Sequence, residues 1–140
     1  MISCNELRVG NYVMVNDDIH IISMINNNDT FSSSTVFIKK DGLESSANAS
    51  CKSSNLQPIP LTDKLLEECF FKFHRHFKFW QLITINDEKQ SEMDIDVDYS
   101  VIDFMRRPVV KRITSLHQLQ NIYFALKGNE LKVNLKESVD

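Results

Sequence analysis

Glycine, proline and cysteine are scarce in this chain of 140 residues, which contains three of each. So few glycines and prolines exclude collagen-like and low-complexity repeats, and nine phenylalanines indicate a folded core instead of disorder. No apolar run approaches the roughly 18 residues that a membrane-spanning helix needs. The first residues lack the basic and apolar regions of a secretory signal, so we expect a cytoplasmic protein.

The three cysteines form no metal-binding or redox motif. Cys4, Cys51 and Cys69 are odd in number, and no two of them are separated by only two residues. His74 and His76 would supply half of a metal site if they lay in a strand, but the lysines and arginines around them would repel a cation. The sequence therefore predicts no bound metal and no other cofactor.

Catalytic motifs are missing as well. The chain has no Gly-x-Ser-x-Gly elbow, no glycine-rich phosphate loop and no His-Glu-x-x-His pair. His117 falls in the first turn of a predicted helix, where capping or packing is the expected role. We therefore predict no catalytic residues and a protein that is not an enzyme. A hydrolytic or metal-dependent enzyme is the weakest of the alternatives.

Short apolar segments separated by polar turns predict an N-terminal β module over residues 1–43. Its strands would pair as a small curled antiparallel sheet or half-barrel. Residues 44–60 follow as a loop and an extended linker, because residues 44–55 lack large apolar side chains and two prolines follow. The strands of the β module are expected at residues 12–15, 19–25 and 35–39.

Residues 61–140 are predicted to form an α+β module that packs with the first module as one compact unit. A short helix is expected over residues 62–70, because Thr62 can cap it and Asp63 suits its positive end. A longer helix begins after Ser115, which forms a capping-box pattern with Gln118. Strands are expected within residues 71–85 and at residues 92–101, 109–114 and 131–135.

These elements predict an α+β fold with antiparallel sheets and two helices. The second helix carries apolar residues at helical spacing and is followed by Gly128, which suits the left-handed position after a helix. We expect this C-terminal helix to pack on a sheet.

The charges are arranged in blocks, although the formal net charge is only −3. Residues 71–86 contain three basic and no acidic side chains, whereas residues 87–103 contain one basic and seven acidic ones. Residues 104–140 are basic again, with seven basic and three acidic side chains. The blocks either pair with each other across a sheet or leave one charged surface for a partner.

The first basic block predicts a binding surface. In an extended segment, Phe71, Phe73, Phe77 and Phe79 would share a buried face, with Arg75 between them. The opposite, exposed face would carry Lys72, His74, His76 and Lys78. Such a row suits phosphates or an acidic protein surface. We call the candidate set the cationic surface, and its members are Lys72, His74, Arg75, His76, Lys78, Arg106, Arg107, Lys111 and Arg112.

The acidic block supplies an alternative binding site. In a strand its alternate carboxylates would repeat every 6.8 Å or so, which is close to the spacing of successive phosphates in a nucleic acid. The row would then mimic phosphates, or it would simply guard an exposed sheet edge. A calcium loop is excluded because Tyr99 stands where the required glycine would be. The carboxylate row consists of Glu92, Asp94, Asp96 and Asp98.

Three segments carry a resemblance to a known family. They are Asn5-Glu-Leu-Arg-Val-Gly-Asn-Tyr-Val13, Leu56-Gln-Pro-Ile-Pro-Leu-Thr62 and Leu116-His-Gln-Leu-Gln-Asn-Ile-Tyr-Phe-Ala-Leu126. In this order and spacing they resemble small uncharacterised proteins of Bacteroidota genomes, phages and prophages. The resemblance spans about residues 5–131. The family usually has a glycine where Cys69 stands and a less basic segment at residues 70–80.

The resemblance implies a mobile genetic element, expression in the cytoplasm of a host bacterium and interference with host defence. Small phage proteins that block RNA-guided nucleases are a known class. We therefore expect a binding protein that inhibits a bacterial defence complex, most specifically an anti-CRISPR that acts on an RNA-guided nuclease. Its partner would be a bacterial protein or a protein–RNA complex. The alternative is a small nucleic-acid-binding accessory protein of a mobile element.

Overall fold

The described part of the chain forms two antiparallel sheets and two helices, which confirms the predicted α+β class. It divides into two units, one comprising Met1–Pro60 with Ser115–Asn121 and the other Leu61–Thr114 with Ile122–Asp140. The computed structural model describes residues 2, 6–26, 35–40, 49–52, 55–83 and 91–135.

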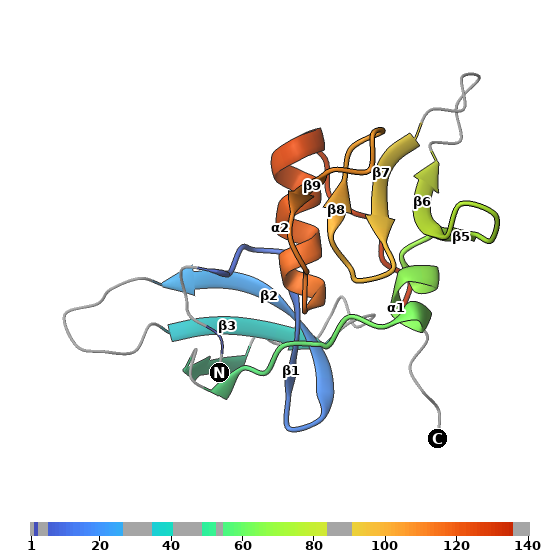
Figure 1. The fold of residues 1–140 in the computed structure, drawn as a ribbon. Coiled ribbons are helices and arrows are strands. Elements are labelled where there is room, and N and C mark those ends of the chain that lie inside the picture. Colours follow the sequence, from blue (N-terminus) through green and yellow to red (C-terminus); the bar gives the residue numbers. More distant parts are fainter. Residues whose placement is uncertain are drawn as a thin grey trace. The chain divides into compact units, whose positions relative to one another are not determined.

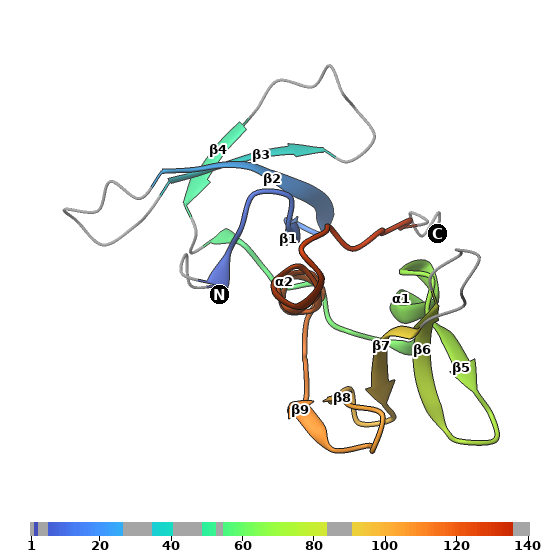
Figure 2. The ribbon, with the colours of Figure 1, turned by 90° about the horizontal axis from the view of Figure 1, so that it is seen from above.

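The first sheet is a four-stranded meander in the order β1-β2-β3-β4 (Figures 1 and 2). The three strands predicted near the N-terminus are confirmed. Asn16 and Asp17 have φ angles of 50° and 68° and form the two-residue turn of the first hairpin, where short polar side chains tolerate a left-handed backbone. The strands are β1 (Tyr12–Val15), β2 (Asp18–Asn26), β3 (Thr35–Lys40) and β4 (Ala49–Lys52).

Strand β4 corrects the prediction that residues 44–55 form a loop. Residues 49–52 pair with β3 through their backbones, and such pairing requires no large apolar side chain. The composition of this segment therefore gave no signal for a strand. The first part of the predicted loop, residues 44–48, lies outside the described residues.

The core of the first unit is a small apolar cluster between its sheet and the segment that follows β4. Leu56 belongs to this cluster, and the backbones of Met14 and Gln57 form two hydrogen bonds of 2.9 and 2.8 Å. The buried members are Ile2, Val13, Ile22, Ile38 and Leu56.

The second sheet is a five-stranded meander with β5 and β9 at its two edges (Figure 2). Trp80, Ile95 and Val101 lie opposite one another in register and are all buried, so this face of the sheet belongs to the core. The strands are β5 (Lys72–His74), β6 (Phe79–Ile83), β7 (Ser91–Asp96), β8 (Val101–Ile102) and β9 (Pro108–Val110).

Helix α1 (Asp63–Glu68) begins as predicted, because Thr62 Oγ1 accepts a hydrogen bond of 3.1 Å from the N–H of Leu65. At its end, the N–H groups of Phe70 and Phe71 bond to the carbonyl oxygens of Glu67 and Leu66, each at 3.0 Å. This is a Schellman ending, in which the first residue after the cap is left-handed. Phe70 holds that position with φ 70° and is exposed.

Helix α2 (Leu116–Lys127) also begins and ends where predicted. Gly128 follows it with φ 74°, and its N–H donates to the carbonyl of Phe124 at 2.8 Å. The strand predicted at residues 131–135 is wrong, because this segment forms no ladder with either sheet. The apolar residues that alternate in this segment include Leu131, which is buried without belonging to a strand. The N–H of Asn134 donates a hydrogen bond to the carbonyl of Glu68.

Replacing Phe70 by glycine should stabilise the protein. Glycine adopts a positive φ without strain, whereas a residue with a side chain loses roughly 1 kcal/mol there. We therefore expect Phe70→Gly to raise the free energy of unfolding by about that amount in a denaturant titration. Phe70→Ala keeps the strain while removing the ring and should not give this gain. Equal effects of the two substitutions would contradict the explanation.

Leu119 and Leu126 lie on the same helix and allow a matched test of packing. Leu119 is fully buried, so Leu119→Ala should reduce the free energy of unfolding by about 2–5 kcal/mol. Leu126 is exposed, and Leu126→Ala should change the same quantity by less than about 0.5 kcal/mol. A small effect at Leu119 would show that this face of α2 is not part of the core.

Candidate binding surface

All residues of the cationic surface lie in the second unit, and all of them are exposed. Lys72 and His74 belong to strand β5. The other members lie in three connecting segments, namely the β5–β6 turn (residues 75–78), the β8–β9 loop (residues 103–107) and the chain that follows β9 (residues 111–112). The predicted basic residues are therefore carried mostly by segments that connect or follow the strands of one sheet.

The β5–β6 turn arranges the phenylalanines differently from the prediction. The N–H of Lys78 donates to the carbonyl of His74 at 2.7 Å, and the tight turn sets His74 opposite Phe79. Directly opposite residues share a face, and these two rings are stacked with centroids 5.2 Å apart. Phe79 therefore lies on the same face as His74, and Phe77 is exposed in the turn. The prediction that the four phenylalanines share one face is wrong, because the turn at residues 75–78 interrupts the alternation of side chains along the chain.

Arg106 connects the β8–β9 loop to the β5–β6 turn. Its guanidinium lies over the ring of Phe79, 5.3 Å from the centroid, and donates a hydrogen bond to the carbonyl of Phe77. A cation above an aromatic face is attracted by the negative charge of that face. These contacts hold the guanidinium of Arg106 against the sheet, so this member of the cationic surface also builds it.

Asp103 shapes the β8–β9 loop. Its Oδ1 accepts hydrogen bonds of 2.9 Å from the N–H groups of Met105 and Arg107, and its Oδ2 lies 3.3 Å from Nε of Arg107. The hydrogen bond from the backbone of Arg107 is the main cause that holds the pKa of Asp103 below its ordinary value. The loop therefore presents an ionised carboxylate beside its two arginines at neutral pH.

Three members of the cationic surface occupy left-handed backbone positions. The φ angles are 55° at Lys78, 63° at Arg106 and 40° at Arg112. A residue with a side chain is less stable there than glycine by roughly 1 kcal/mol. The chain thus carries long basic side chains at positions where the backbone alone would favour glycine.

The strand predicted at residues 92–101 ends early, at Asp96, and that prediction is wrong over its second half. Asp96 Oδ1 accepts from the N–H of Val97 at 2.7 Å, and Asp98 Oδ1 accepts from the N–H of Ser100 at 3.0 Å. Aspartate side chains that bond to nearby backbone in this way compete with a strand ladder and favour a turn. The bond from Ser100 is also the main cause that lowers the pKa of Asp98.

The carboxylate row is therefore not a regular row of four. Glu92 accepts a hydrogen bond of 2.7 Å from the hydroxyl of Tyr123, whose pKa is raised to about 12 by burial and by this carboxylate. Asp98 lies in the turn. Glu92, Asp94 and Asp96 remain as alternate carboxylates on the strand itself, and Glu92 is the one that Tyr123 engages.

Parts of both predicted binding surfaces share one face of the second sheet. Across β5, β6 and β7, one register row reads Lys72, Gln81 and Asp94, and the next reads His74, Phe79 and Asp96. The basic residues of β5 do not pair directly with the carboxylates of β7, because β6 lies between these strands. Asp103 of the acidic block, however, forms an ion pair of 3.3 Å with Arg107 of the second basic block. We call this side the charged face, and it comprises Lys72, His74, Phe79, Gln81, Asp94 and Asp96.

A pocket of about 240 Å³ opens on the charged face. The buried side chain of Ile102 lines it together with aromatic rings and charged groups, whereas Phe104 at its rim is 88% exposed. Sequence reasoning missed this pocket, because it depends on strand register and on the path of the β8–β9 loop. We call it the sheet pocket, and its lining residues are Phe77, Phe79, Asp94, Ile102, Asp103, Phe104 and Arg106.

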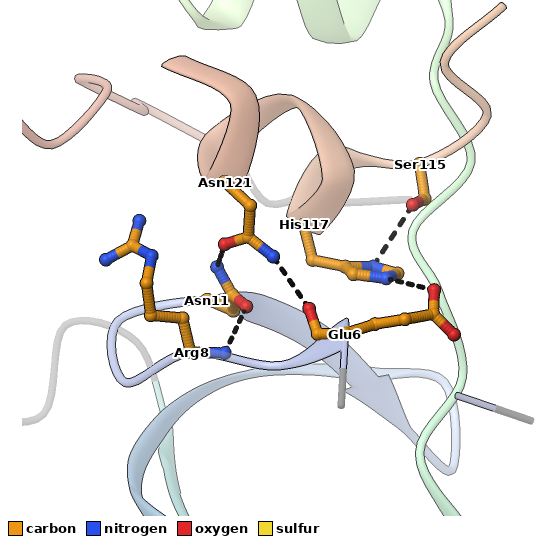
Figure 3. A network of polar contacts seen from close by, with 6 residues as sticks. All are labelled: Glu6, Arg8, Asn11, Ser115, His117 and Asn121. Atoms are coloured by element: carbon orange, nitrogen blue, oxygen red, sulfur yellow. Dashed lines mark hydrogen bonds and ion pairs between the residues drawn. The ribbon is translucent and has the colours of Figure 1, made fainter. Parts of the chain in front are cut away.

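The first unit contains a separate network of polar side chains (Figure 3). Asn11 Nδ2 donates to Asn121 Oδ1 at 2.8 Å, while Asn11 Oδ1 accepts from the N–H of Arg8 at 2.7 Å. Asn121 Nδ2 donates to the carbonyl of Glu6. Asn11 is fully buried, and its hydrogen bonds satisfy the polar groups that burial removes from water.

His117 continues this network between a serine and a carboxylate. Its Nδ1 lies 3.1 Å from Ser115 Oγ, and its Nε2 lies 3.4 Å from Glu6 Oε1 (Figure 3). A serine, a histidine and an acid also make up hydrolytic triads, but Ser115 and His117 are both 2% exposed. A substrate has no approach to this hydroxyl. The geometry supports the packing role that we predict for His117.

The three segments that carry the family resemblance meet in the first unit. Asn11 contacts Asn121 as described, Gln120 contacts the backbone of Gly10 at 3.1 Å, and the N–H of Leu116 donates to the carbonyl of Ile59 at 2.9 Å. These contacts give the motif residues a structural role. The charged face lies outside these segments, so its function must be argued from its own chemistry.

No candidate metal site is found among the described residues, where no cluster of three or more His, Cys, Asp or Glu side chains is placed to hold an ion. Cys69 is buried, and burial, followed by the charge of Glu68, raises the pKa of its thiol to about 12. Within the same residues, no helix is long and apolar enough to cross a membrane. No family model, curated protein or solved structure matches the chain.

His117 should make stability depend on pH. Burial lowers the pKa of its imidazole, although Glu6 partly opposes this effect. In the unfolded chain the imidazole of His117 binds a proton more readily, because its pKa there is about 6.5. The free energy of unfolding should therefore fall as the pH drops below that value. Denaturant titrations at several pH values between neutral and mildly acidic would measure this slope.

The matched variant is His117→Gln, which keeps a polar side chain but does not titrate. Its free energy of unfolding should fall less steeply over the same pH range, even if the variant is less stable at neutral pH. Equal slopes for wild type and variant would show that His117 is not the group responsible.

Proposed function

We propose that this protein is a phage- or prophage-type binding protein without catalytic function that inhibits a bacterial defence complex. The most specific form of the proposal is an anti-CRISPR that acts on an RNA-guided nuclease in the host cytoplasm. The observation that carries it is the charged face of the second sheet, with the exposed basic residues and aromatic rings around it. The resemblance to Bacteroidota phage and prophage proteins supports the biological setting.

The basic residues around this face are suited to binding, although Arg106 also packs on Phe79. They are exposed, and exposed charges contribute little to stability. Lys78, Arg106 and Arg112 occupy strained backbone positions, so their side chains are retained against a local preference for glycine. Arginine and lysine in such an arrangement would contact phosphates or an acidic protein surface and would accelerate association with either.

The face also has the composition of a protein-binding surface. Phe77, Phe104 and Met105 are exposed near Arg106, and Phe, Met and Arg are enriched where proteins bind one another. Asp94 and Asp96 on the same face would repel the phosphates of a nucleic acid that ran across it. These carboxylates favour a protein surface as the main contact within a protein–RNA complex.

A second candidate is a nucleic-acid-binding accessory protein of a mobile element. The exposed rings of Phe77 and Phe104 favour it, because bases of single strands stack on aromatic side chains beside basic residues. The inhibitor could also bind through its carboxylates instead of its basic residues. In that case Asp94 and Asp96 would mimic phosphates and bind a basic groove of the partner.

Reversing the charges of the basic residues and, separately, of the carboxylates should distinguish these proposals. The variant Lys72→Glu, Arg75→Glu, Lys78→Glu should fold with stability within about 1 kcal/mol of wild type, because all three side chains are exposed. It should lose the nuclease complex in co-purification from host lysate and lose inhibition of target cleavage. Wild-type binding should also weaken as salt is raised.

The matched control is Lys64→Glu, Lys127→Glu, Lys132→Glu, which makes the same change in net charge at exposed positions elsewhere in the second unit. It should keep both binding and inhibition. Retained binding in the first variant, together with loss in Asp94→Lys, Asp96→Lys, would overturn our choice of surface. Recovery of nucleic acid without a protein partner would favour the second candidate.

A further inference from the structure

The β8–β9 loop is crossed by its own hydrogen bonds. The N–H of Asp103 donates to the carbonyl of Arg107 at 3.0 Å, and the N–H of Arg106 donates to the carbonyl of Asp103 at 2.9 Å. The carboxylate of Asp103 accepts two more hydrogen bonds from backbone N–H groups and pairs with Arg107. A loop that is ordered before it meets a partner loses less conformational entropy on binding. The loop is therefore preorganised to present the side chains at its tip.

Phe104 stands at this tip and is the most exposed large apolar side chain in the described part of the chain, at 88%. Met105 beside it is 59% exposed. A large apolar ring in water gains free energy when a partner covers it. A single exposed apolar residue is common on protein surfaces. Phe104 differs because its loop is preorganised and because other flat side chains lie beside it.

These flat side chains come from two connecting segments and from strands β5 and β6. Three of them line the sheet pocket together with Phe104, and they are Phe77, Phe79 and Arg106. His74 is stacked on Phe79 with ring planes 1° apart, and His76 contacts Phe77 with centroids 4.7 Å apart. Aromatic rings and guanidinium planes are the groups on which proteins stack unpaired nucleobases. The pocket of about 240 Å³ is smaller than a typical small-molecule site, so it has room for one flat ring.

Basic side chains surround these flat groups. Lys78 follows Phe77 in the β5–β6 turn, and both are exposed. Arg107 keeps 72% of its side chain exposed even though it pairs with Asp103. Proteins bind single-stranded nucleic acids with basic groups beside aromatic rings, because the rings stack on bases while the cations contact phosphates.

The carboxylates of β7 limit where a nucleic acid can run. Asp94 and Asp96 lie on the charged face and would repel phosphates that crossed it. The charge of Asp103 is met by Arg107 and by backbone N–H groups, so it opposes a phosphate at the loop much less. The favourable contacts therefore follow the β5–β6 turn and the β8–β9 loop, which Arg106 holds together.

We propose that the β5–β6 turn and the β8–β9 loop bind an unpaired segment of nucleic acid in the protein–RNA complex. One base stacks on Phe104 and another on Phe77, while Lys78 and Arg107 contact the phosphates. The inference rests on the proposed function, because it assumes that the partner contains RNA. It adds a nucleic-acid contact at the loops to the protein contact of the charged face.

A nucleobase fits Phe104 better than the other partners that would cover it. An apolar pocket of a protein would cover Phe104 and Met105 but would give no role to the flat groups gathered beside them. A membrane surface would require more apolar area than two side chains offer, because even one myristoyl chain binds membranes only marginally. A base uses the ring, the neighbouring planes and the basic side chains together.

The experiment is a binding titration of the full chain, followed by the fluorescence anisotropy of a labelled oligonucleotide at low salt. The probe is octauridylate, which has bases but no stable secondary structure. The matched control has the same length, label and phosphates but an abasic ribose at every position. We expect saturable binding of octauridylate and at least about tenfold weaker binding of the abasic oligomer, because only phosphate contacts remain.

Octadeoxyuridylate identifies the source of the nucleic acid. A preference for the RNA form would point to the guide RNA of the complex. Equal binding would admit a displaced DNA strand as well, because stacking and phosphate contacts do not require the 2′-hydroxyl. Both results support the inference.

Phe104 is tested by a pair of variants. Phe104→Ala should weaken octauridylate by about fivefold or more, whereas Phe104→Tyr keeps a flat ring and should stay within about twofold of wild type. Neither should change the affinity for the abasic oligomer by more than about twofold. Phe104 is so exposed that its replacement leaves the fold intact. Phe70→Ala removes an exposed ring elsewhere and should leave both affinities unchanged.

Four results would overturn the inference. They are no saturable binding of octauridylate, equal binding of the abasic oligomer, an unchanged affinity in Phe104→Ala, and loss of the nuclease complex in Phe104→Ala when the wild type binds no octauridylate. The last result would assign the ring to a pocket of the partner protein.

The failure of this inference and the failure of the proposed function are distinguishable. If octauridylate does not bind but the charge-reversal variant still loses the nuclease complex, only the inference fails. If octauridylate binds through Phe104 but no nuclease complex is recovered with wild type, the loops bind nucleic acid and the proposed function fails.

Discussion

The side-chain amide of Gln120 joins helix α2 to strand β1 in the first unit. Its Oε1 accepts from the N–H of Tyr12 at 2.8 Å, and its Nε2 donates to the carbonyl of Gly10 at 3.1 Å, while the side chain itself is buried. One residue of helix α2 thereby satisfies two backbone groups beside strand β1. Such bonds are directional, so they fix the register of helix and strand in a way that apolar packing alone does not.

The second unit depends on a different constraint, which is the alternation of side chains along its strands. Trp80, Ile95 and Val101 place one face of the sheet in the core. The other face of the sheet is outside this core, and it carries Asp94 and Asp96 together with the basic residues of β5. The first unit thus adds buried polar contacts to its apolar core, whereas exposed charges line one face of the sheet in the second.

The sequence was sufficient for elements with local signals and insufficient for those that depend on pairing. Helix α1 could be predicted from Thr62 and helix α2 from Gly128, because caps act within a few residues. Strand β4 carries no large apolar side chain, and alternating apolar residues continue beyond Asp96 although the chain turns there. Asp94 and the β8–β9 loop meet in one pocket because of the register of strands β6, β7 and β8, which no local pattern contains.

The placement of the basic side chains in connecting segments has a consequence for how this protein would diverge. The turn at residues 75–78 and the loop at residues 103–107 contribute exposed side chains but little to the core. Substitutions there alter charge and shape at the surface while the strands that carry them stay the same. Under the function we propose, the contacts with a partner could therefore be changed by substitution in two short segments without rebuilding the sheet that carries them.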